Sequence, residues 1–330
     1  MRGFVARGDL TIGRVYKKAR FVGYTSEAFT VADASSRLGN GSTGILGPTM
    51  RAAAGDVLRI VFRNSLNFPA NLVFAGSSLQ PAFARTRAAG VSTAWSAANI
   101  IQGSASELAV REVQPGDEVE MFYVVPATAA PGPSDPPTIA WTYSSSVSHS
   151  HLHAGLAGAL VVAADPAALV VGTPQHGAQR EYVLAWYISN ENNSPFLDDN
   201  ILQYTLAPGN VSKDDEGFQE SNLKHAVNGR LACNLGGLEA AAGETVRLHM
   251  LGLGSELDMH TPQVHGAMAR TGSVAGGAAG RAGYVATVGV HPGARSTVDV
   301  AVSQGGAWLL ECGVNDHWAA GMRTQLVVEA

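Results

Sequence analysis

The sequence predicts an all-β protein made of two tandem Greek-key β-sandwiches. The apolar segments are short, and Gly, Pro, Asn and Asp residues separate them, which is typical of sandwiches rather than of alternating strands and helices. No long stretch repeats its apolar residues with the 3.6-residue period of a helix, so we expect few helices. The chain also repeats itself, which predicts two copies of one sandwich.

Apolar runs of strand length follow one another along the chain, and turn-forming residues bound each of them. The runs that we predict to be strands are 56–64, 118–125, 158–164, 180–189, 244–253, 296–302 and 307–314.

Three pairs of segments resemble each other. They are 52–64 with 240–252, 113–125 with 290–302, and 155–162 with 321–328. The members of these pairs lie about 188, 177 and 166 residues apart. Because a repeat of this length corresponds to one folding unit, we predict that the polar, Pro-containing stretch 165–179 joins two similar sandwiches.

The composition excludes some classes of partner. The chain has 330 residues, of which 46% are hydrophobic and 15% charged, so it can bury cores for roughly two domains. The net charge is −5 and no basic run is present, which argues against nucleic acid as a partner. No apolar run approaches the roughly 20 residues of a membrane-spanning helix.

Cys312 lies near the end of the predicted strand 307–314, and His317 and Met322 come after it at equal spacing. A thiolate, two imidazoles and a weak axial thioether are the ligands of a type 1 (blue) copper site. The second imidazole must then come from elsewhere in the chain, and His260 is the candidate. The alternative is a buried free cysteine beside an unrelated histidine, since cysteine is often buried.

The chain resembles ceruloplasmin, hephaestin and the related multicopper ferroxidases along nearly its whole length. The stretches that carry the resemblance are 12–29, 44–56, 155–162, 180–194, 218–231, 257–266 and 308–322. The resemblance implies tandem cupredoxin domains, with a copper-free domain at residues 1–170 and a copper-binding domain at residues 171–330. It also implies that His260, Cys312, His317 and Met322 hold a type 1 copper.

The resembled family reduces oxygen at a trinuclear copper cluster held by His-x-His pairs, and this chain departs from that pattern. At the positions of three of these pairs, this chain has Glu311 and Gly313, Gln263 and His265, and Val73 and Ala75. A glycine cannot bind a metal, and a lone carboxylate replaces an imidazole poorly at copper. We therefore expect one type 1 copper, no cluster, and no reduction of oxygen to water by this chain alone.

The fourth pair of the family falls on Tyr143 and Ser145 when the sequences are aligned without gaps. His149, His151 and His153 follow shortly afterwards. On a strand, these alternating histidines would share one face about 7 Å apart, which could hold a metal ion. The alternative is a solvated, histidine-rich loop.

Glu220 and His225 match, by type and spacing, two residues that bind Fe(II) near a type 1 copper in the resembled family. A third iron ligand of the family, an aspartate, is replaced by Ala286. Oxygen ligands and one imidazole suit iron. The alternative is that Glu220 pairs locally and His225 supports the copper loop.

The remaining cysteine and histidines carry weaker expectations. We predict that Cys233 is a buried thiol on a strand and that His249 is structural. His176 and His291 are predicted to lie in loops.

The location of the protein is predicted mainly by the resemblance, which implies an extracellular or cell-surface protein. Asn40, Asn192 and Asn210 begin triplets for N-glycosylation, which favours a secreted glycoprotein. The first ten residues lack the apolar core of a signal peptide, so the chain is either cytosolic or part of a longer protein.

We therefore expect an electron-transfer unit of a larger ferroxidase-like multicopper oxidase. The electron donor would be Fe(II) or another one-electron donor, and the partners would be other cupredoxin domains of a longer chain or an oligomer. Whether the chain is itself an enzyme stays open. The alternatives are a complete ferroxidase, a two-domain oxidase or reductase that acts as a homo-oligomer, and a metal-free cupredoxin scaffold.

Overall fold

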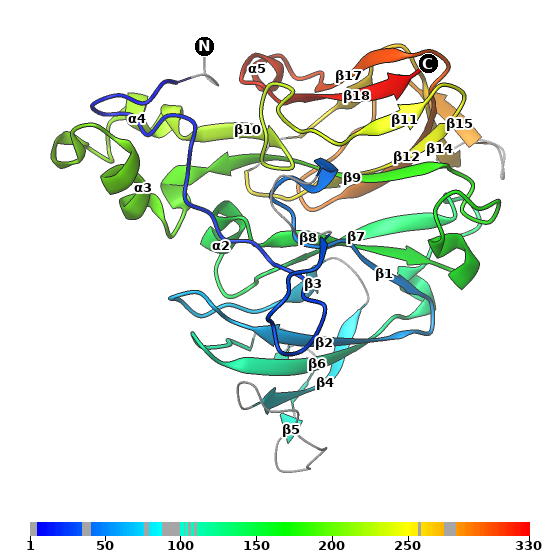
Figure 1. Ribbon diagram of the computed structural model, residues 1–330, viewed down its shortest axis with the longest axis horizontal. Helices are drawn as coiled ribbons and strands as arrows, with labels where there is room; N and C mark the ends of the chain where they lie inside the picture. Colours follow the sequence, from blue (N-terminus) through cyan, green and yellow to red (C-terminus); the bar gives the residue numbers. More distant parts are fainter. Residues whose placement is uncertain are drawn as a thin grey trace.

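The computed structural model describes most of the chain (Figure 1). The described residues are 5–34, 41–75, 79–87, 100–101, 103–104, 107–108, 111–256, 259–273 and 282–330. The glycosylation triplet at Asn40 begins outside them.

Strands dominate the described residues, which confirms the predicted all-β class. The strands of the first half are β1 (Met50–Ala53), β2 (Val57–Arg63), β3 (Val73–Ala75), β4 (Gln80–Arg87), β5 (Ile100–Ile101), β6 (Glu118–Val124), β7 (Thr138–Ser144) and β8 (Ala157–Ala163). Those of the second half are β9 (Arg180–Asn190), β10 (Leu223–Val227), β11 (Glu239–Ala241), β12 (Thr245–Gly252), β13 (Pro262–Val264), β14 (Ala269–Ser273), β15 (Ala282–Val285), β16 (Arg295–Ala301), β17 (Gly306–Cys312) and β18 (Arg323–Glu329).

The helices are short, as the sequence predicts. The α-helices are α2 (Ser150–Ala154), α3 (Leu197–Tyr204), α4 (Glu216–Ser221) and α5 (Asn315–Ala319). Single 3₁₀ turns cover Gly41–Thr43, Ala127–Ala129, Pro166–Leu169, Glu191–Asn193 and Pro208–Asn210. Within the described ranges, none of these helices has the length and apolar character needed to cross a bilayer.

The two halves have matching sheets. The order β1-β8-β7-β3 in the first half corresponds to β11-β18-β17-β13 in the second, and β2-β6-β4-β5 corresponds to β12-β16-β14-β15. In the first pair of sheets, β1 pairs in parallel with β8, the last strand of the first half, and β11 pairs in parallel with β18, the last strand of the second. The repeated segments found in the sequence therefore lie on equivalent strands. The domain boundary at residue 170 stays a prediction.

The pairing is equivalent residue by residue. Arg59 pairs with Phe122 between β2 and β6, and the repeat places Arg247 and Asp299 at the same positions. These two residues are indeed partners between β12 and β16. The three repeat spacings therefore align residues that occupy the same positions in the strand pairing of the two halves.

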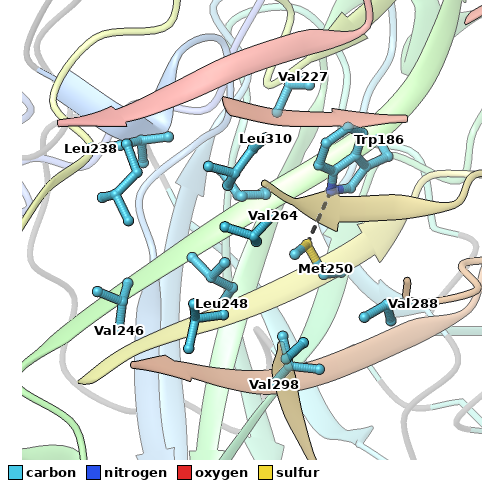
Figure 2. Close-up of a cluster of buried hydrophobic side chains, with 14 of the residues drawn as sticks. Trp186, Val227, Leu238, Val246, Leu248, Met250, Val264, Val288, Val298 and Leu310 are labelled. Atoms are coloured by element: carbon cyan, nitrogen blue, oxygen red, sulfur yellow. Dashed lines mark hydrogen bonds between the residues drawn. The ribbon is translucent and has the colours of Figure 1, made fainter. Parts of the chain in front are cut away.

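Each half has its own apolar core, and a third cluster joins them. Figure 2 shows the core of the second half, where Trp186, Met250 and Leu310 are buried and the Trp186 Nε1–H donates to Met250 Sδ at 3.2 Å. In the cluster at the junction, Val161 of β8 and Val183 of β9 are buried together. Figure 1 accordingly shows β7 and β8 facing β9 between the lower and upper sheets.

A buried carboxylate also ties the halves together at this junction. Glu181 accepts hydrogen bonds from Nε2 of His176 and Nε2 of His249, each at 3.0 Å, and from Thr138 Oγ1 at 2.8 Å. Arg51 of β1 forms an ion pair with it. Burial raises the pKa of this carboxyl group, but the two histidine hydrogen bonds and the nearby positive charges outweigh burial and hold the pKa far below its ordinary value. His176 thus lies in a loop, as predicted, and is buried at the junction. His249 is structural, as expected.

Arg247 crosses the same junction and is completely buried. Its guanidinium makes two hydrogen bonds to Asp299, at 2.8 and 2.9 Å. It also donates to the His176 carbonyl at 2.7 Å and to Thr138 Oγ1 at 3.2 Å. Because removing one partner would leave a buried charge unpaired, this network strongly favours one arrangement of the two halves.

Candidate metal centre

Three of the predicted copper ligands meet inside the second half. Cys312 ends β17, His317 lies in α5, and His260 is held beside Val290 by a pair of backbone hydrogen bonds. The three side chains are buried, with exposed fractions of 0, 5 and 4%. Their ligand atoms all lie within 4.8 Å of one another.

The spacing of these atoms fits a single ion. Cys312 Sγ lies 3.5 Å from His317 Nδ1, and Nδ1 of His317 lies 3.3 Å from Nδ1 of His260. Bonds of about 2.0–2.3 Å, at angles between tetrahedral and trigonal, place such ligand atoms about 3.3–3.7 Å apart. One thiolate and two imidazoles at these separations therefore suit a copper ion without rearrangement.

The backbone supports the sulfur. The Thr261 N–H donates to Cys312 Sγ at 3.4 Å. Thr261 directly follows His260, so one extended segment supplies both an imidazole and a hydrogen-bond donor to the sulfur. This donor helps to fix the position of the sulfur beside the imidazoles.

Met322, the fourth predicted ligand, closes the loop that carries Cys312 and His317. Its N–H donates to the His317 carbonyl at 2.9 Å, and its carbonyl accepts from the Cys312 N–H at 3.1 Å. The Met322 side chain is completely buried. Gly321 precedes it with φ +101°, a conformation that glycine adopts without strain, and this turns the chain from α5 into β18. The role of Met322 as an axial ligand stays a prediction.

Both residues that flank Cys312 form hydrogen bonds with the segment 261–265. Gln263 lies opposite Glu311 in the β13–β17 pair. Glu311 Oε1 accepts from His265 Nε2 at 2.7 Å and from Gln263 Nε2 at 3.2 Å. The Gly313 N–H donates to the Thr261 carbonyl at 3.1 Å. The carboxylate and the surviving histidine of the family pattern thus form a hydrogen-bonded pair beside the cysteine.

The first half contains a counterpart of this centre without its ligands. Ser145 Oγ lies 2.8 Å from His151 Nδ1, as Cys312 Sγ lies near His317 Nδ1. The Asn71 N–H donates to Ser145 Oγ at 3.2 Å, as the Thr261 N–H donates to the cysteine sulfur. The scaffold around the metal centre is therefore present twice.

The other two ligand positions of the first half hold apolar residues. Ala70 is bridged to Val113 in the way that His260 is bridged to Val290. Leu156 exchanges backbone hydrogen bonds with Ser145 and His151, as Met322 does with Cys312 and His317. Of the four positions, only that of His151 keeps a residue that binds metals readily.

Sequence reasoning missed this equivalence although the signal was available. The match of 155–162 with 321–328 aligns His151 with His317 directly. Strand pairing aligns Ser145 with Cys312, because Ser144 pairs with Ala157 as Glu311 pairs with Arg323. The connection is one residue longer in the first half, so alignment without gaps places Ser145 one position away.

His149, His151 and His153 do not lie on a strand, so the predicted common strand face is wrong. His151 and His153 belong to α2, and His149 precedes it. The ring of His151 packs against Phe68, with centroids 4.9 Å apart, and His153 Nδ1 accepts from the Asn190 N–H at 3.2 Å. Burial lowers the pKa of both helical histidines. In the described part of the chain, only His260, Cys312 and His317 form a group of metal-binding geometry.

His225 lies beside the metal centre, and Glu220 precedes it in the chain. His225 is a buried residue of β10, and its ring centroid lies 5.2 Å from that of His317. Glu220 belongs to α4 and is half-buried. An iron-binding role for the pair stays a prediction.

Cys233 differs from its prediction. It is half-buried in a turn with φ +64°, and not on a strand. Its N–H donates to the Arg323 carbonyl at 3.0 Å. Burial raises the pKa of this thiol, with Glu311 adding to the effect and Arg323 opposing it. Cys233 and Cys312 are both free thiols.

Comparison with known proteins gives a consistent result. Residues 214–330 match the family model described as multicopper oxidase. The chain is 33% identical to ceruloplasmin of Homo sapiens over 98% of its own length and 27% of that protein. It is 32% identical to hephaestin of Homo sapiens over 98% of its length and 25% of that protein. The chain thus spans about a quarter of the length of these relatives.

Solved structures share the fold at low sequence identity. A copper nitrite reductase from Nitrosomonas europaea matches 94% of this chain and 91% of its own, with a TM-score of 0.54 and 14% identity. A multicopper oxidase matches 86% of this chain and 78% of its own, with a TM-score of 0.52 and 17% identity. The likeness shows a shared sandwich fold and supports the predicted fold class.

Proposed function

We propose, from the match of residues 214–330 to the multicopper oxidase family model, that the chain is an electron-transfer unit with one type 1 copper. The observation that carries the proposal is the buried group of His260, Cys312 and His317, whose ligand atoms have the spacing of a single coordination shell. Copper bound there supplies one-electron transfer between its two common oxidation states.

The residues of the chain prepare this site for rapid electron transfer. Cys312 presents a sulfur that already accepts the Thr261 N–H, and the two imidazoles reach it from separate elements. Met322 would supply a weakly bound thioether as the fourth ligand. Because the loop between Cys312 and Met322 is closed by backbone hydrogen bonds at both ends, the ligands are held in place and little must rearrange when an electron moves.

We propose that electrons leave through His317. Its helix α5 also carries Trp318, which is 43% exposed and stacks with the guanidinium of Arg323 at 4.8 Å. The proposed acceptor is a copper outside this chain, since Glu311 and Gly313 occupy the positions beside the cysteine where cluster ligands would be expected. We therefore propose that the chain forms no trinuclear cluster of its own.

Fe(II) is the proposed electron donor. One relative is named a ferroxidase, HEPHL1 of Homo sapiens, and it is 29% identical over 99% of this chain and 26% of that protein. His225 supports this proposal because its ring lies against that of His317. Glu220 would supply an oxygen ligand, and two ligands from this chain leave room for a third from a neighbouring domain.

The proposed setting is outside the cell or at its surface, among other cupredoxin domains of a larger chain or oligomer. Within this chain, the proposed domains are 1–170 without copper and 171–330 with copper. Asn210 is exposed, which suits an N-linked glycan, whereas Asn192 is half-buried and hydrogen-bonded to Asn190.

Copper counting with visible and electron-spin-resonance spectroscopy tests the proposal. We expect one copper per chain, an intense blue absorption, and no magnetically coupled copper pair. Cys312→Ser should abolish the blue absorption, while Cys233→Ser serves as the matched control and should leave it intact. Blue colour that survives Cys312→Ser would contradict the site.

Oxygen consumption with Fe(II) separates the relay from a complete oxidase. The copper-loaded chain should oxidise Fe(II) once per copper and then stop, unless an external oxidant is supplied. Sustained turnover with oxygen would favour a complete ferroxidase or a homo-oligomeric oxidase, and absence of copper binding would favour a metal-free scaffold.

A further inference from the structure

The carboxylate of Glu311 is buried next to the candidate metal centre, and only one of its oxygens is satisfied. Glu311 directly precedes Cys312 in β17, and its side chain is only 9% exposed. Its Oε1 accepts the hydrogen bonds from His265 and Gln263, whereas its Oε2 is buried and has no hydrogen-bond partner. Among the described residues, no lysine or arginine forms an ion pair with this carboxylate. Burying a charge in this way opposes folding, because its lost hydration is not replaced.

The strand pairing does not require this carboxylate. In the first half, Ser144 of β7 lies opposite Val73 of β3, as Glu311 of β17 lies opposite Gln263 of β13. The same pair of strands therefore forms with a neutral serine in place of the glutamate. An incompletely satisfied buried group that the fold can omit calls for a role other than folding.

Glu311 and Cys312 point to different sides of β17, because successive side chains leave a strand on opposite faces. The sulfur of Cys312 lies beside the two histidine ligands. The carboxylate of Glu311 instead makes its hydrogen bonds to His265 and Gln263, neither of which belongs to that group of ligands. Glu311 can therefore influence the centre through its charge without binding the metal.

The charge of Glu311 is felt by its surroundings. Burial raises the pKa of the Cys233 thiol, and the negative charge of Glu311 raises it further. Buried charges are screened by salt much less than exposed ones. A metal ion held by Cys312 would therefore be exposed to the field of the residue that directly precedes this cysteine.

A fixed negative charge acts unequally on the two oxidation states of copper. The oxidised ion carries one more positive charge than the reduced ion, so a nearby carboxylate stabilises the oxidised state more strongly. The net charge and the buried surroundings of a metal site set its reduction potential in this way. A lower potential makes the reduced site a stronger electron donor.

We propose that the Glu311 carboxylate lowers the reduction potential of the copper centre and so favours transfer of its electron to an acceptor. The inference rests on the proposed function, because it needs a copper held by His260, Cys312 and His317. It gives Glu311 a role in electron transfer in which it sets the potential and touches neither the donor nor the acceptor.

Glu311→Gln tests the proposal, because it removes the charge and keeps both the size of the side chain and an oxygen that can accept from His265. The copper-loaded protein is equilibrated with a fixed mixture of ferricyanide and ferrocyanide at pH 8, and the blue absorption reports the oxidised fraction. One electron passes from the reduced centre to ferricyanide, which gives the oxidised centre and ferrocyanide. We expect the ratio of reduced to oxidised centre to rise about tenfold in Glu311→Gln, which is a potential increase of about 59 mV for a one-electron couple.

Two further variants separate charge from structure. Glu329→Gln is the matched control, since Glu329 is an exposed carboxylate of β18. It lies about 20 Å along this strand from Arg323, the residue that pairs with Glu311. It should change the ratio by less than about twofold. Glu311→Gln combined with Gln263→Glu moves the carboxylate to the directly opposite residue and should restore most of the shift. A purely structural role of Glu311 would not be restored by this exchange.

The outcomes distinguish the inference from the proposed function. Glu311→Ser, which copies Ser144 of the first half, is the second test variant and should shift the ratio in the same direction as Glu311→Gln. Blue protein in which both variants keep the ratio within about twofold of wild type would overturn the inference and leave the copper site intact. An equal shift in Glu329→Gln would also overturn it, because the effect would then not depend on the position of the carboxylate. A wild-type chain that never becomes blue with copper would instead contradict the proposed function.

Discussion

The connection from β7 to β8 and the connection from β17 to β18 are two versions of one structure. Both hold a short helix, a glycine of positive φ, and a histidine whose Nδ1 lies close to a residue at or directly after the end of the preceding strand. That residue is Ser145 in the first half and Cys312 in the second. The backbone hydrogen bonds of the two loops also correspond. The comparison teaches that the scaffold of a metal centre persists without its ligands, because strand pairing and the apolar core stabilise it.

The two halves also differ at the sheets that contain β2 and β12. There the second half buries Trp186 of β9, whereas among the described residues of the first half no strand pairs with the outer edge of β2, and a groove lies beside it. Trp186→Ala should therefore destabilise the protein by about 3–5 kcal/mol, since it empties a closely packed core position. Phe62, which the repeat aligns with Met250, lies beside the groove and is only half-buried, and Phe62→Ala is the variant for comparison. We expect it to cost about half as much, as measured by urea denaturation. Equal costs would contradict the difference between the halves.

Supplying the missing ligands should give the first half its own metal site. Ala70→His, Ser145→Cys and Leu156→Met together reproduce the ligand set on the same scaffold. Ala70 borders the groove, which leaves space for the imidazole. The triple variant should bind two coppers per chain instead of one. Copper at about a hundred times its dissociation constant should stabilise this half by about 2.7 kcal/mol.

The control for this variant keeps serine at residue 145 and carries only the other two changes. It should bind one copper, since it lacks the thiolate. Copper counting, with hydrogen exchange to locate the stabilised half, is the measurement. A single copper in the triple variant would mean that the extra residue of the β7–β8 connection disturbs the site.

The junction provides a pH-dependent test of what joins the halves. The pKa of Glu181 lies below its ordinary value in the folded protein. Its contribution to stability is therefore present above the unfolded pKa of about 4.3 and is lost as the pH falls further toward the folded value. Glu181→Gln should cost about 2 kcal/mol at pH 7, because the charged partner of Arg51 and of two histidine donors is lost.

Urea denaturation at pH 7, 5 and 3.5 measures this effect. The stability difference between wild type and Glu181→Gln should be similar at pH 7 and 5 and should shrink at pH 3.5. Glu244→Gln, at an exposed ion pair with Arg180, is the control and should change stability by less than about 1 kcal/mol. A difference that does not change with pH would show that the charge of Glu181 is not what stabilises the junction.

The smallest expected effect tests whether the two scaffolds respond alike. Gly55 and Gly243 occupy equivalent turns, each with φ +91°, and in each the space for a Cβ is open. Gly55→Ala and Gly243→Ala should both cost about 1 kcal/mol, since only backbone strain is involved. Thermal unfolding of the two variants should agree within about 0.5 kcal/mol. A larger disagreement would mean that one turn is supported by contacts that the other lacks.

Local patterns predicted the strands and much of the site. The apolar runs became strands such as β2, β9 and β12, because their residue types and bounding turns leave few alternatives. Cys312, His317 and His260 lie together as expected. The first two could be predicted because they belong to one tight loop. His260 could be predicted because the expected ligand set needs a second imidazole. The resemblance to a known family added the domain arrangement and the expected absence of a cluster.

The rest depends on packing between distant segments. His149, His151 and His153 alternate in a way that suits a strand, but three alternate residues also fit one turn of helix, and Gly155 ends that helix with φ +108°. Glu181 forms a hydrogen bond with His249, which lies 68 residues later in the chain, and no local sequence pattern predicts a contact between such distant residues. The difference between β2 and β12 in strand pairing could not be predicted from their own sequences either. The two strands have similar sequences, and only the strands beside them differ.

The complete burial of Cys312 bears on how the protein matures. A thiol with no exposed surface is shielded from oxidants and cannot exchange with disulfides in solution. Its sulfur also accepts a hydrogen bond from the Thr261 N–H. If copper binds here as proposed, an ion that reached the folded chain would have to pass between buried side chains, and the exposed Trp318 marks where α5 lies nearest the surface. Loading of the folded protein with copper would then be slow, and the rate at which the blue colour develops would report how often the centre opens.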